Sequence, residues 1–258
     1  MYGAIIGDLA GSIYEFDQTK NVREIKPSKI LEKDAFFSDD TILTMATLDA
    51  ILENKSYKEM YKKYYQDFKN YKPDFEPYFK SAFSPGFSKW ARGDVDGVSI
   101  GNGALMRLSP IPYIYDNTLA MYINLYDSVN TSHNSEEARM YALSLANFII
   151  KANNPSAREL LLSDYYDLKY TPFTKFNTTC KETLPNVLYA VLTSKDFEEA
   201  ILKTVSMGGD TDTNAAIAGS IAEALFGIPD SLKKDANKYI PDEFVEKLEK
   251  GYRLVKKR

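Results

Sequence analysis

Glycine recurs at every fourth position near the start of the chain, at Gly3, Gly7 and Gly11. In a helix this spacing puts all three glycines on one face, which is then bare of side chains. Glycine inside a helix costs about 0.5–1 kcal/mol relative to alanine, and close contact between helix backbones is the usual feature that offsets this cost. A second helix, predicted after Thr213, has a similar thin face formed by Ala215, Ala218, Gly219 and Ala222. We therefore expect both helices at the centre of a bundle, with the turns that flank them brought together.

Helical periodicity dominates the rest of the sequence, and no convincing strand pattern with a period of two residues is present. Apolar stripes with helical spacing predict helices over residues 56–71, 135–151, 183–194, 196–206 and 242–255. Ser135, Asp196 and Asp242 are the expected N-caps of three of these helices, and Pro185 is expected in the first turn of another. Residues 72–112 are rich in Pro, Gly and Ser and are expected to be irregular. Since no linker-like segment interrupts the chain, we predict a single domain over residues 1–258.

Composition excludes several classes of function. The chain has 258 residues, 44% of them hydrophobic, and a formal net charge of −4, so it can bury a large core but has no basic field for general nucleic-acid binding. Cys180 is the only cysteine, which excludes an intramolecular disulfide. No apolar run reaches membrane-spanning length, and the first residues lack a basic leader. We therefore expect a soluble cytoplasmic protein that binds neither membranes nor nucleic acid in general.

Two acidic turns stand in front of predicted helices far apart in the chain. Residues 36–41 read FFSDDT and residues 207–213 read MGGDTDT, so each turn carries two carboxylates flanked by hydroxyl groups. Capping is one explanation, because aspartate, serine and threonine accept hydrogen bonds from free N–H groups at a helix start. A cap does not account for two carboxylates in each turn, nor for the Gly208-Gly209 pair, which lets the backbone fold tightly.

If the two turns converge, four carboxylates share a small volume, and like charges so close repel strongly. Divalent cations relieve this repulsion, and all-oxygen ligands suit Mg²⁺, Mn²⁺ or Ca²⁺. Zinc prefers histidine and cysteine, of which the chain has only His133 and Cys180. Considered together, the turns favour a metal site over two independent caps. Two cations about 3.5–4 Å apart could polarise a substrate and position a water molecule.

The sequence resembles the ADP-ribosylglycohydrolase family, which includes the dinitrogenase reductase-activating glycohydrolases. The resemblance runs nearly from end to end. It is carried by GAIIGDLAGSIYEF (3–16), FSDDT (37–41), IGNGALMRLSPI (100–111), NTSHNSEEA (130–138) and GGDTDTNAAIAGSIAEALFGIP (208–229). The resemblance implies an all-α fold, a compact orthogonal helical bundle, with two Mg²⁺ or Mn²⁺ ions bound in a cleft.

The same resemblance implies specific ligands and catalytic residues. Asp212 is the expected bridging carboxylate of a metal-ligand set that comprises Ser38, Asp39, Asp40, Asp210, Asp212 and Thr213. The family usually has threonine at the position of Ser38, and because serine also offers a hydroxyl oxygen we expect the ligand to be kept. Glu15 and Asp40 are the expected catalytic residues, with Glu15 matching a family acid beside the metals and the scissile bond. It could act as general base, general acid or gate, and without the resemblance it would be read as a surface acid.

The substrate side is expected around a glycine-rich segment. Glycines next to Asn102 let backbone N–H groups approach a diphosphate closely. His133 matches a recurrent family position, although a lone histidine is usually structural, and Arg107 either pairs with a phosphate or forms a structural ion pair. The expected substrate-binding residues are Ser99, Gly101, Asn102, Gly103, Met106 and His133.

The implied activity is metal-dependent hydrolysis of the glycosidic bond at the anomeric carbon of ADP-ribose, where oxocarbenium character develops. The substrate would be an ADP-ribosylated protein or a small molecule that contains ADP-ribose. The alternatives are a non-catalytic ADP-ribose-binding protein on the same scaffold and a metal-dependent phosphoester hydrolase. Related enzymes act on linkages to arginine, to serine or to an acetyl ester. The loops expected to choose among these linkages, residues 69–99 and 153–175, have no readable code.

Overall fold

The computed structural model of the protein describes residues 1–75, 81–115, 118–156, 161, 163, 165 and 167–256. Over these residues the chain is all-α, as predicted, and its β-type pairings are two isolated bridges, Val98 with His133 and Gly101 with Thr179. The helices in chain order are α1 (Tyr2–Gly11), α2 (Glu15–Gln18), α3 (Asp39–Leu52), α4 (Tyr57–Phe68), α5 (Pro85–Arg92), α6 (Gly103–Met106), α7 (Pro110–Ile114), α8 (Thr118–Asn130), α9 (Glu136–Asn153), α11 (Cys180–Leu192), α12 (Phe197–Ser206), α13 (Thr211–Phe226), α14 (Asp230–Ala236) and α15 (Asp242–Lys256), with a 3₁₀ turn at Asn237–Tyr239. Among the described helices, none is long and apolar enough to cross a bilayer.

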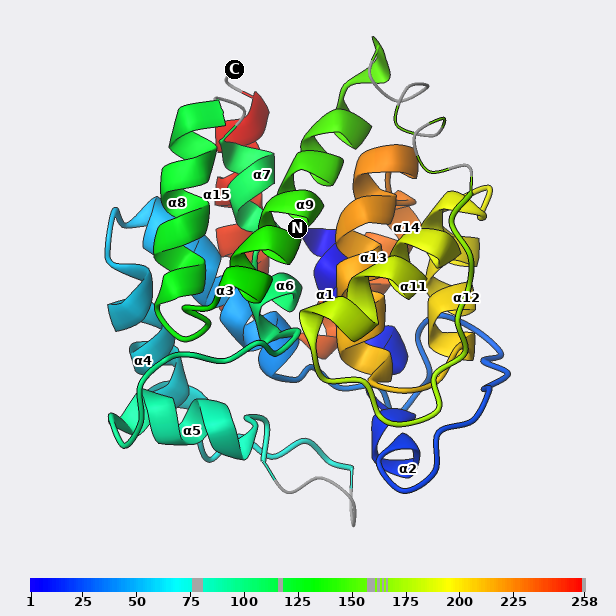
Figure 1. The fold of residues 1–258 in the computed structure, drawn as a ribbon, viewed down its shortest axis with the longest axis horizontal. Coiled ribbons are helices and arrows are strands. Elements are labelled where there is room, and N and C mark those ends of the chain that lie inside the picture. The colour runs from blue at the N-terminus through cyan, green and yellow to red at the C-terminus, as the bar shows by residue number, and fades with distance from the viewer. Residues whose placement is uncertain are drawn as a thin grey trace.

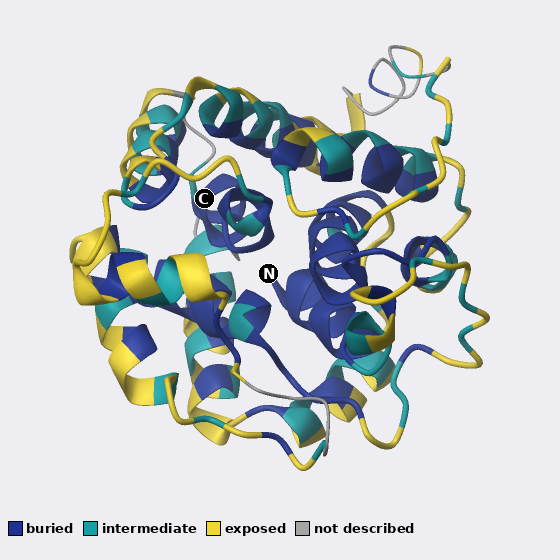
Figure 2. Cartoon of the chain, turned by 60° about the horizontal axis from the view of Figure 1, so that its bottom comes forward, coloured by how far each residue is buried: buried dark blue, intermediate teal, exposed yellow. Residues whose placement is uncertain are grey.

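Helices α1 and α13 lie side by side at the centre of the molecule (Figure 1). All ten residues of α1 are buried, and the helix that starts at the N label is dark blue in Figure 2. A Cβ atom built on Gly3 would lie 2.0 Å from the carbonyl oxygen of Gly219, and one built on Gly7 would lie 1.9 Å from that of Ala215. These distances allow only glycine at the contact, so the predicted approach of two bare helix faces is confirmed. The two helices run antiparallel, which brings the end of α1 to the start of α13.

The remaining helices surround this pair. The tyrosine stripe of α4 faces inward, with Tyr61 and Tyr64 almost completely buried, and α3, α4 and α15 lie on the same side of the central pair (Figure 1). Helices α11 and α12 lie on the other side of α13. The helix predicted over residues 56–71 is therefore confirmed, and its apolar stripe is part of the core. The central pair, enclosed in this way, can hold polar residues only at its ends or with partners.

Of the four residues predicted at helix starts, two agree with the structure and two do not. Ser135 and Asp196 are N-caps, accepting hydrogen bonds from the backbone N–H groups of Ala138 and Glu199. Asp242 is instead the first residue of α15. Pro185 lies inside α11 and not in its first turn, because the Thr179 hydroxyl caps the helix and starts it at Cys180.

Within residues 72–112, the described part contains more helix than the sequence indicated. Helix α5 begins with Pro85, capped by the hydroxyl of Ser84, and ends at Gly93 in the left-handed conformation (φ 89°). Helix α6 and the start of α7 also fall in this range, and α8 follows in a segment where no helix was expected. Helices α5, α6 and α7, of 8, 4 and 5 residues, carry too few turns for an apolar period to stand out in the sequence, whereas α8, with 13 residues, is not short.

Candidate metal centre

The first acidic turn, residues 38–41, is held in place by a carboxylate from α1. Asp8 uses one oxygen, Oδ2, to accept hydrogen bonds from the backbone N–H of Ser38 at 2.9 Å and from the backbone N–H and hydroxyl of Thr41 at 3.0 and 2.5 Å. The Ser38 hydroxyl also caps α3, accepting from the N–H of Asp40 at 3.2 Å. The capping interpretation is therefore correct for Ser38, while Asp39 and Asp40 remain free to face the cleft.

The second acidic turn, residues 208–213, is held by neutral amides. Gly208 and Gly209 have φ values of 71° and 75°, which favour glycine. The backbone N–H of Gly209 donates to Gln18 Oε1 at 3.2 Å, and that of Asp210 donates to Asn177 Oδ1 at 2.9 Å. A Cβ atom on Gly209 would lie 2.2 Å from Asn177 Oδ1, so the amide and the glycine require each other.

Asp210 precedes α13 but does not act as its side-chain cap. Its side chain makes no capping hydrogen bond to α13, and its Oδ2 instead accepts from Asn102 Nδ2 at 2.7 Å. The capping interpretation is thus wrong for Asp210. Asn102, which was expected on the substrate side, ties the glycine-rich segment of residues 101–103 directly to the second turn.

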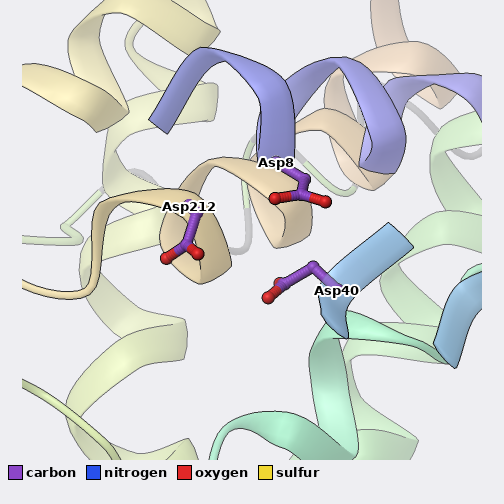
Figure 3. A group of neighbouring side chains, drawn as sticks. All are labelled: Asp8, Asp40 and Asp212. Atoms are coloured by element: carbon purple, nitrogen blue, oxygen red, sulfur yellow. The ribbon is translucent and has the colours of Figure 1, made fainter. Parts of the chain in front are cut away.

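The two turns meet although their residues are far apart in sequence. Thr213 donates its hydroxyl hydrogen to Asp40 Oδ2 at 3.1 Å, across 173 positions of the chain. Ligand oxygens of Asp8, Asp40 and Asp212 lie within 4.8 Å of one another, as do those of Glu15, Asp210 and Asp212. Figure 3 shows Asp8, Asp40 and Asp212 pointing toward one another from α1, α3 and α13. Asp212 belongs to both groups and therefore lies at the centre of the acidic cluster.

Burial and mutual repulsion make it costly in free energy for the carboxyl groups of this cluster to be ionised without a counter-charge. Burial is the largest cause that raises the pKa of Asp8 to about 7, and the charge of Asp212 is the next. Burial also raises the pKa of Asp210 to about 6 and that of Asp212 well above its usual value. The pKa of Glu15, which is half-buried, is raised by burial and then by Asp212 and Asp210. Positive charge placed among these groups would stabilise their ionised forms.

The donor set fits hard divalent cations. Asp8 Oδ1 and Asp40 Oδ1 are buried carboxylate oxygens that have no hydrogen-bond partner in the described part of the chain. An unsatisfied buried carboxylate oxygen is costly unless a cation or donor reaches it. Carboxylate and hydroxyl oxygens are the ligands of Mg²⁺, Mn²⁺ and Ca²⁺. The cluster therefore has the chemistry of a site for such ions.

The acidic cluster opens into a cleft of about 940 Å³. The aromatic rings of Phe83, Phe87 and Trp90 line another part of the cleft. Every site residue named from the sequence lines this one cleft: Glu15, Ser38, Asp39, Asp40, Ser99, Gly101, Asn102, Gly103, Met106, His133, Asp210, Asp212 and Thr213. The structure thus brings all the candidate residues together, and Asp8 lies behind them.

Arg107 is fully buried beside the cleft and stacks on the ring of Tyr61, with the guanidinium carbon 4.1 Å from the ring centroid. No described carboxylate lies within ion-pair distance of it, so of the two alternatives for Arg107 the structural ion pair is absent among the described residues. Its Nη2 instead donates to Ser132 Oγ at 2.7 Å and lies 3.4 Å from His133 Nδ1. Burial, and then the charge of Arg107, lower the pKa of His133 well below its usual value.

Sequence reasoning missed the residues that hold the turns, Asp8, Gln18 and Asn177. Asp8 carried a usable signal, because it is the one charged residue in a helix that is otherwise apolar or glycine on every face. A helix apolar all round is buried, and a buried carboxylate needs partners. Gln18 and Asn177 carried no such signal, since their roles depend on which loops reach them.

Comparison with known proteins identifies the family to which the chain belongs. The family described as ADP-ribosylglycohydrolase matches the sequence over residues 1–257. The chain belongs to the ADP-ribosylglycohydrolase family. A solved ADP-ribosylglycohydrolase-related protein complex shares the fold, with a TM-score of 0.71 over 98% of this chain and 95% of that chain, at 21% sequence identity.

Two curated relatives of this glycohydrolase-family chain are each 27% identical to it. One is the ADP-ribosylarginine hydrolase Tri1 of Pseudomonas putida (strain GB-1), aligned over 61% of this chain and 44% of the relative. The other is the ADP-ribosyl-[dinitrogen reductase] glycohydrolase of Rhodospirillum rubrum, aligned over 50% of this chain and 47% of the relative. The alignments thus span less than half the length of these relatives.

Proposed function

We propose that this chain is a Mg²⁺- or Mn²⁺-dependent hydrolase that cleaves the glycosidic bond at the anomeric carbon of ADP-ribose. It would release ADP-ribose from a modified protein side chain or from a small molecule. The observation that carries the proposal is the meeting of two acidic turns beside one large cleft, with ligand oxygens in two groups that share Asp212. Membership of the ADP-ribosylglycohydrolase family supports the reaction class.

The residues proposed to hold two cations are those of the two turns, with Asp212 as the shared carboxylate: Ser38, Asp39, Asp40, Asp210, Asp212 and Thr213. Bound cations would supply Lewis-acid polarisation and orient the ribose hydroxyl groups and a water molecule. The unsatisfied oxygen of Asp40 and the unsatisfied oxygen of Asp8 support this assignment. Asp8 is placed to orient the first turn and to add negative charge behind the ions.

Glu15 and Asp40 are the proposed catalytic carboxylates. Glu15 is the first residue of α2, lines the cleft and brings an oxygen within 4.8 Å of oxygens of Asp210 and Asp212. A carboxyl group with access both to the open cleft and to the cluster can move a proton to the leaving group or from an attacking water. Asp40, on α3, lines the same cleft and would hold the water or a ribose hydroxyl group.

The substrate side of the proposal uses the wall formed by Ser99, residues 101–103, Met106 and His133. This wall borders the same cleft as Glu15 and would take the diphosphate and distal ribose. The hydrogen bond from Asn102 to Asp210 links the wall to the second acidic turn. A bound diphosphate would therefore have a fixed position relative to the metal ligands. Such a link favours reaction of a correctly placed ribose.

We propose that the leaving group is an arginine side chain, so ADP-ribosylated arginine is the first substrate to test. Both curated relatives bear names of ADP-ribosyl hydrolases, one of them specifically of ADP-ribosylarginine. Near Glu15 the cleft is lined by Phe16 and Phe36, whose rings stack with centroids 6.3 Å apart. Guanidinium groups stack well on aromatic faces. Residues 76–80 and several of residues 157–166, within the loops expected to select the linkage, lie outside the described residues.

The direct test is turnover of a substrate panel that differs only in the linkage: arginine, serine and acetyl ester. We expect release of intact ADP-ribose from at least one substrate, abolished by EDTA and restored by Mg²⁺ or Mn²⁺. Asp212→Asn should lower kcat/KM by at least about a hundredfold, because changes around a metal typically cost 10–100-fold even outside its ligands. Asp17→Asn, on the exposed face of α2, is the matched control and should leave turnover unchanged.

The product separates the alternatives. Release of AMP would assign the pyrophosphate bond as the target and contradict the proposal. Binding of ADP-ribose with no product from any member of the panel, in protein that binds Mn²⁺, would support a non-catalytic ADP-ribose-binding protein.

A further inference from the structure

His133 is the only histidine of the chain, and its ring borders the cleft while its side chain is 6% exposed. Backbone hydrogen bonds fix the turn that carries it: Asn134 N–H donates to Gly97 O at 2.7 Å, and Ser99 N–H donates to Ser132 O at 3.2 Å. A Cβ atom on Gly97 would lie 2.3 Å from Thr131 O, so the two segments are in close contact. The ring therefore has little freedom to move.

One ring nitrogen, Nδ1, lies within hydrogen-bond distance of Arg107 and Ser132. Arg107 Nη2 lies 2.7 Å from Ser132 Oγ and 3.4 Å from His133 Nδ1, and Ser132 Oγ lies 2.9 Å from His133 Nδ1. A guanidinium group only donates hydrogen bonds, so Ser132 Oγ accepts from Arg107 and its own hydrogen is free for Nδ1. Nη2 also lies 3.5 Å from Ser128 O, but it carries only hydrogens, so a hydrogen on Nδ1 would point toward it. The contacts therefore favour Nδ1 as the acceptor, with the Ser132 hydroxyl as its donor. In a neutral imidazole the proton is then on Nε2.

The other ring nitrogen faces the glycine-rich wall. Nε2 lies 3.4 Å from the position that a Cβ atom on Gly103 would occupy, and 3.6 Å from the equivalent position at Gly101. Within the described part of the chain, Nε2 makes no hydrogen bond. The absence of side chains at both glycines leaves the Nε2–H group accessible from the cleft.

We propose that Arg107 and Ser132 are positioning residues that lock His133 as its Nε2–H tautomer, so that it donates a hydrogen bond to a diphosphate oxygen in the cleft. The identity of the anion rests on the proposed function, which places the diphosphate of ADP-ribose along residues 101–103. The tautomer itself follows from the contacts of Nδ1 alone. In this tautomer the neutral ring can only donate at Nε2, so it can bind an anion without carrying a charge.

The surroundings of Arg107 agree with an anionic ligand nearby. Its Nε and Nη1 groups are buried and have no hydrogen-bond partner among the described residues, and no described carboxylate pairs with it. A buried cation without an ion pair leaves a positive potential at the cleft wall. That potential keeps the adjacent imidazole neutral, in agreement with its lowered pKa, and attracts anions.

The first experiment reads the tautomer directly. Because His133 is the only histidine, protein labelled with ¹⁵N-histidine gives one imidazole, and its two nitrogens can be assigned without ambiguity. We expect an unprotonated Nδ1 and a protonated Nε2 at pH 7, and a change at Nε2 on addition of ADP but not of adenosine. A protonated Nδ1, an imidazolium ion, or an Nε2 signal that ADP does not move would overturn the proposal.

The second experiment uses affinity for ADP, with adenosine as the ligand that lacks phosphate. His133→Leu removes the donor and should weaken ADP binding roughly ten- to a hundredfold, the range for a hydrogen bond to a charged group. His133→Gln can place an amide N–H where Nε2 lies and should recover most of this loss. Equal losses for ADP and adenosine in His133→Leu would show a structural role and contradict the proposal.

The positioning residues are tested through the ring. Ser132→Ala should give a mixture of tautomers in the ¹⁵N spectrum and weaken ADP binding roughly three- to tenfold. Ser132→Thr keeps the hydroxyl and should restore both. A Ser132→Ala protein with the wild-type tautomer and ADP affinity would show that Ser132 does not position the ring. Since these measurements need no turnover, absence of hydrolysis with an intact Nε2 response would contradict only the proposed function, and hydrolysis without that response only this inference.

Discussion

The two acidic turns present the same kinds of ligand atoms but are held by opposite means. The first is held by a charged group, Asp8, whose single oxygen Oδ2 accepts three hydrogen bonds from Ser38 and Thr41. The second is held by the neutral amides of Gln18, Asn177 and Asn102 and by two glycines in the left-handed conformation. One turn therefore adds a carboxylate to the cluster through its support, and the other adds none.

This difference teaches how the protein balances charge in a buried site. A site supported by carboxylates on both sides would have still more mutual repulsion, and one supported by amides alone would have less attraction for cations. The mixed arrangement makes the first turn sensitive to pH and to cations. The second turn depends mainly on shape. Four measurements test whether the two turns differ in this way.

Both turns flank the central helix pair, so a side chain that blocks the close approach of α1 and α13 should displace both turns at once. A Cβ atom on Gly219 would lie 1.9 Å from the carbonyl oxygen of Gly3, which is backbone and cannot move aside. Gly219→Ala should therefore lower the free energy of unfolding by at least about 3 kcal/mol, the upper range for overpacking. Chemical denaturation measures this. Gly86→Ala, where no atom lies within 4 Å of the new Cβ, is the control, and an equal effect there would contradict the account.

Cations should stabilise the protein, and more so at higher pH. At a concentration of one hundred times Kd, Mn²⁺ or Mg²⁺ should add about 2.7 kcal/mol to the free energy of unfolding. The folded pKa values of Asp8 and Asp210, about 7 and about 6, exceed the usual 3.8, so the folded state without cations holds extra protons between these values. Its stability should fall as the pH rises through this range, whereas cation affinity should rise.

Thermal unfolding from pH 5 to 8, with EDTA or with Mn²⁺, measures both trends. A stabilisation by cations that stays constant over this range would show that the acidic cluster is not the binding site.

Asp8→Asn tests the charged support of the first turn. The variant keeps the size of the side chain but removes a negative charge and one acceptor, so cation affinity should fall about 10–100-fold, as for other groups that orient metal ligands. Titration with Mn²⁺ followed by electron paramagnetic resonance gives the affinity. Asp17→Asn, exposed and paired with Arg23, should have no effect. Unchanged affinity in Asp8→Asn would assign Asp8 a purely structural role.

Asn102→Ala tests the neutral support of the second turn and should have the smallest effect. It removes one hydrogen bond to Asp210, of 2.7 Å, at a cost of about 1.5 kcal/mol, the lower end for bonds to charged groups. Denaturation measures the loss, and exposed Asn21→Ala provides the baseline. Because the hydrogen bond from Asn102 lowers the pKa of Asp210, the loss should be larger above about pH 6, where Asp210 is ionised, than below it. A loss that stays constant from pH 5 to 8 would show that Asn102 does not stabilise the ionised form of Asp210.

The sequence was sufficient to predict features that depend on a repeated spacing or on a local cluster of residues. The spacing of Gly3, Gly7 and Gly11 predicted the central contact, and the two acidic turns were visible as patterns of carboxylates and hydroxyls. Asn177 could not be found in this way. Its partner is the backbone of Asp210, 33 positions away, and that pairing exists only after the loop before α11 has reached α13.

The same limit explains two of the interpretations that changed, those of Asp210 and Arg107. Asp210 looks like a cap, because it precedes a helix, but Asn102 occupies its side chain from another part of the chain. Arg107 looks like a partner for a carboxylate, but stacking on Tyr61 and the hydroxyl of Ser132 hold it instead. Local sequence shows what a side chain can do, and tertiary contacts select among those options.

The antiparallel contact between α1 and α13 also sets the timing of assembly. During synthesis α1 leaves the ribosome some two hundred residues before α13, and until then the bare glycine face and Asp8 have no partner. A nascent chain that stops short of Gly208 has the first turn without the second, and so cannot complete the cluster. Cation capture should accordingly be a late event in biogenesis, coincident with the docking of α13, and arrested chains of increasing length would show at which residue it begins.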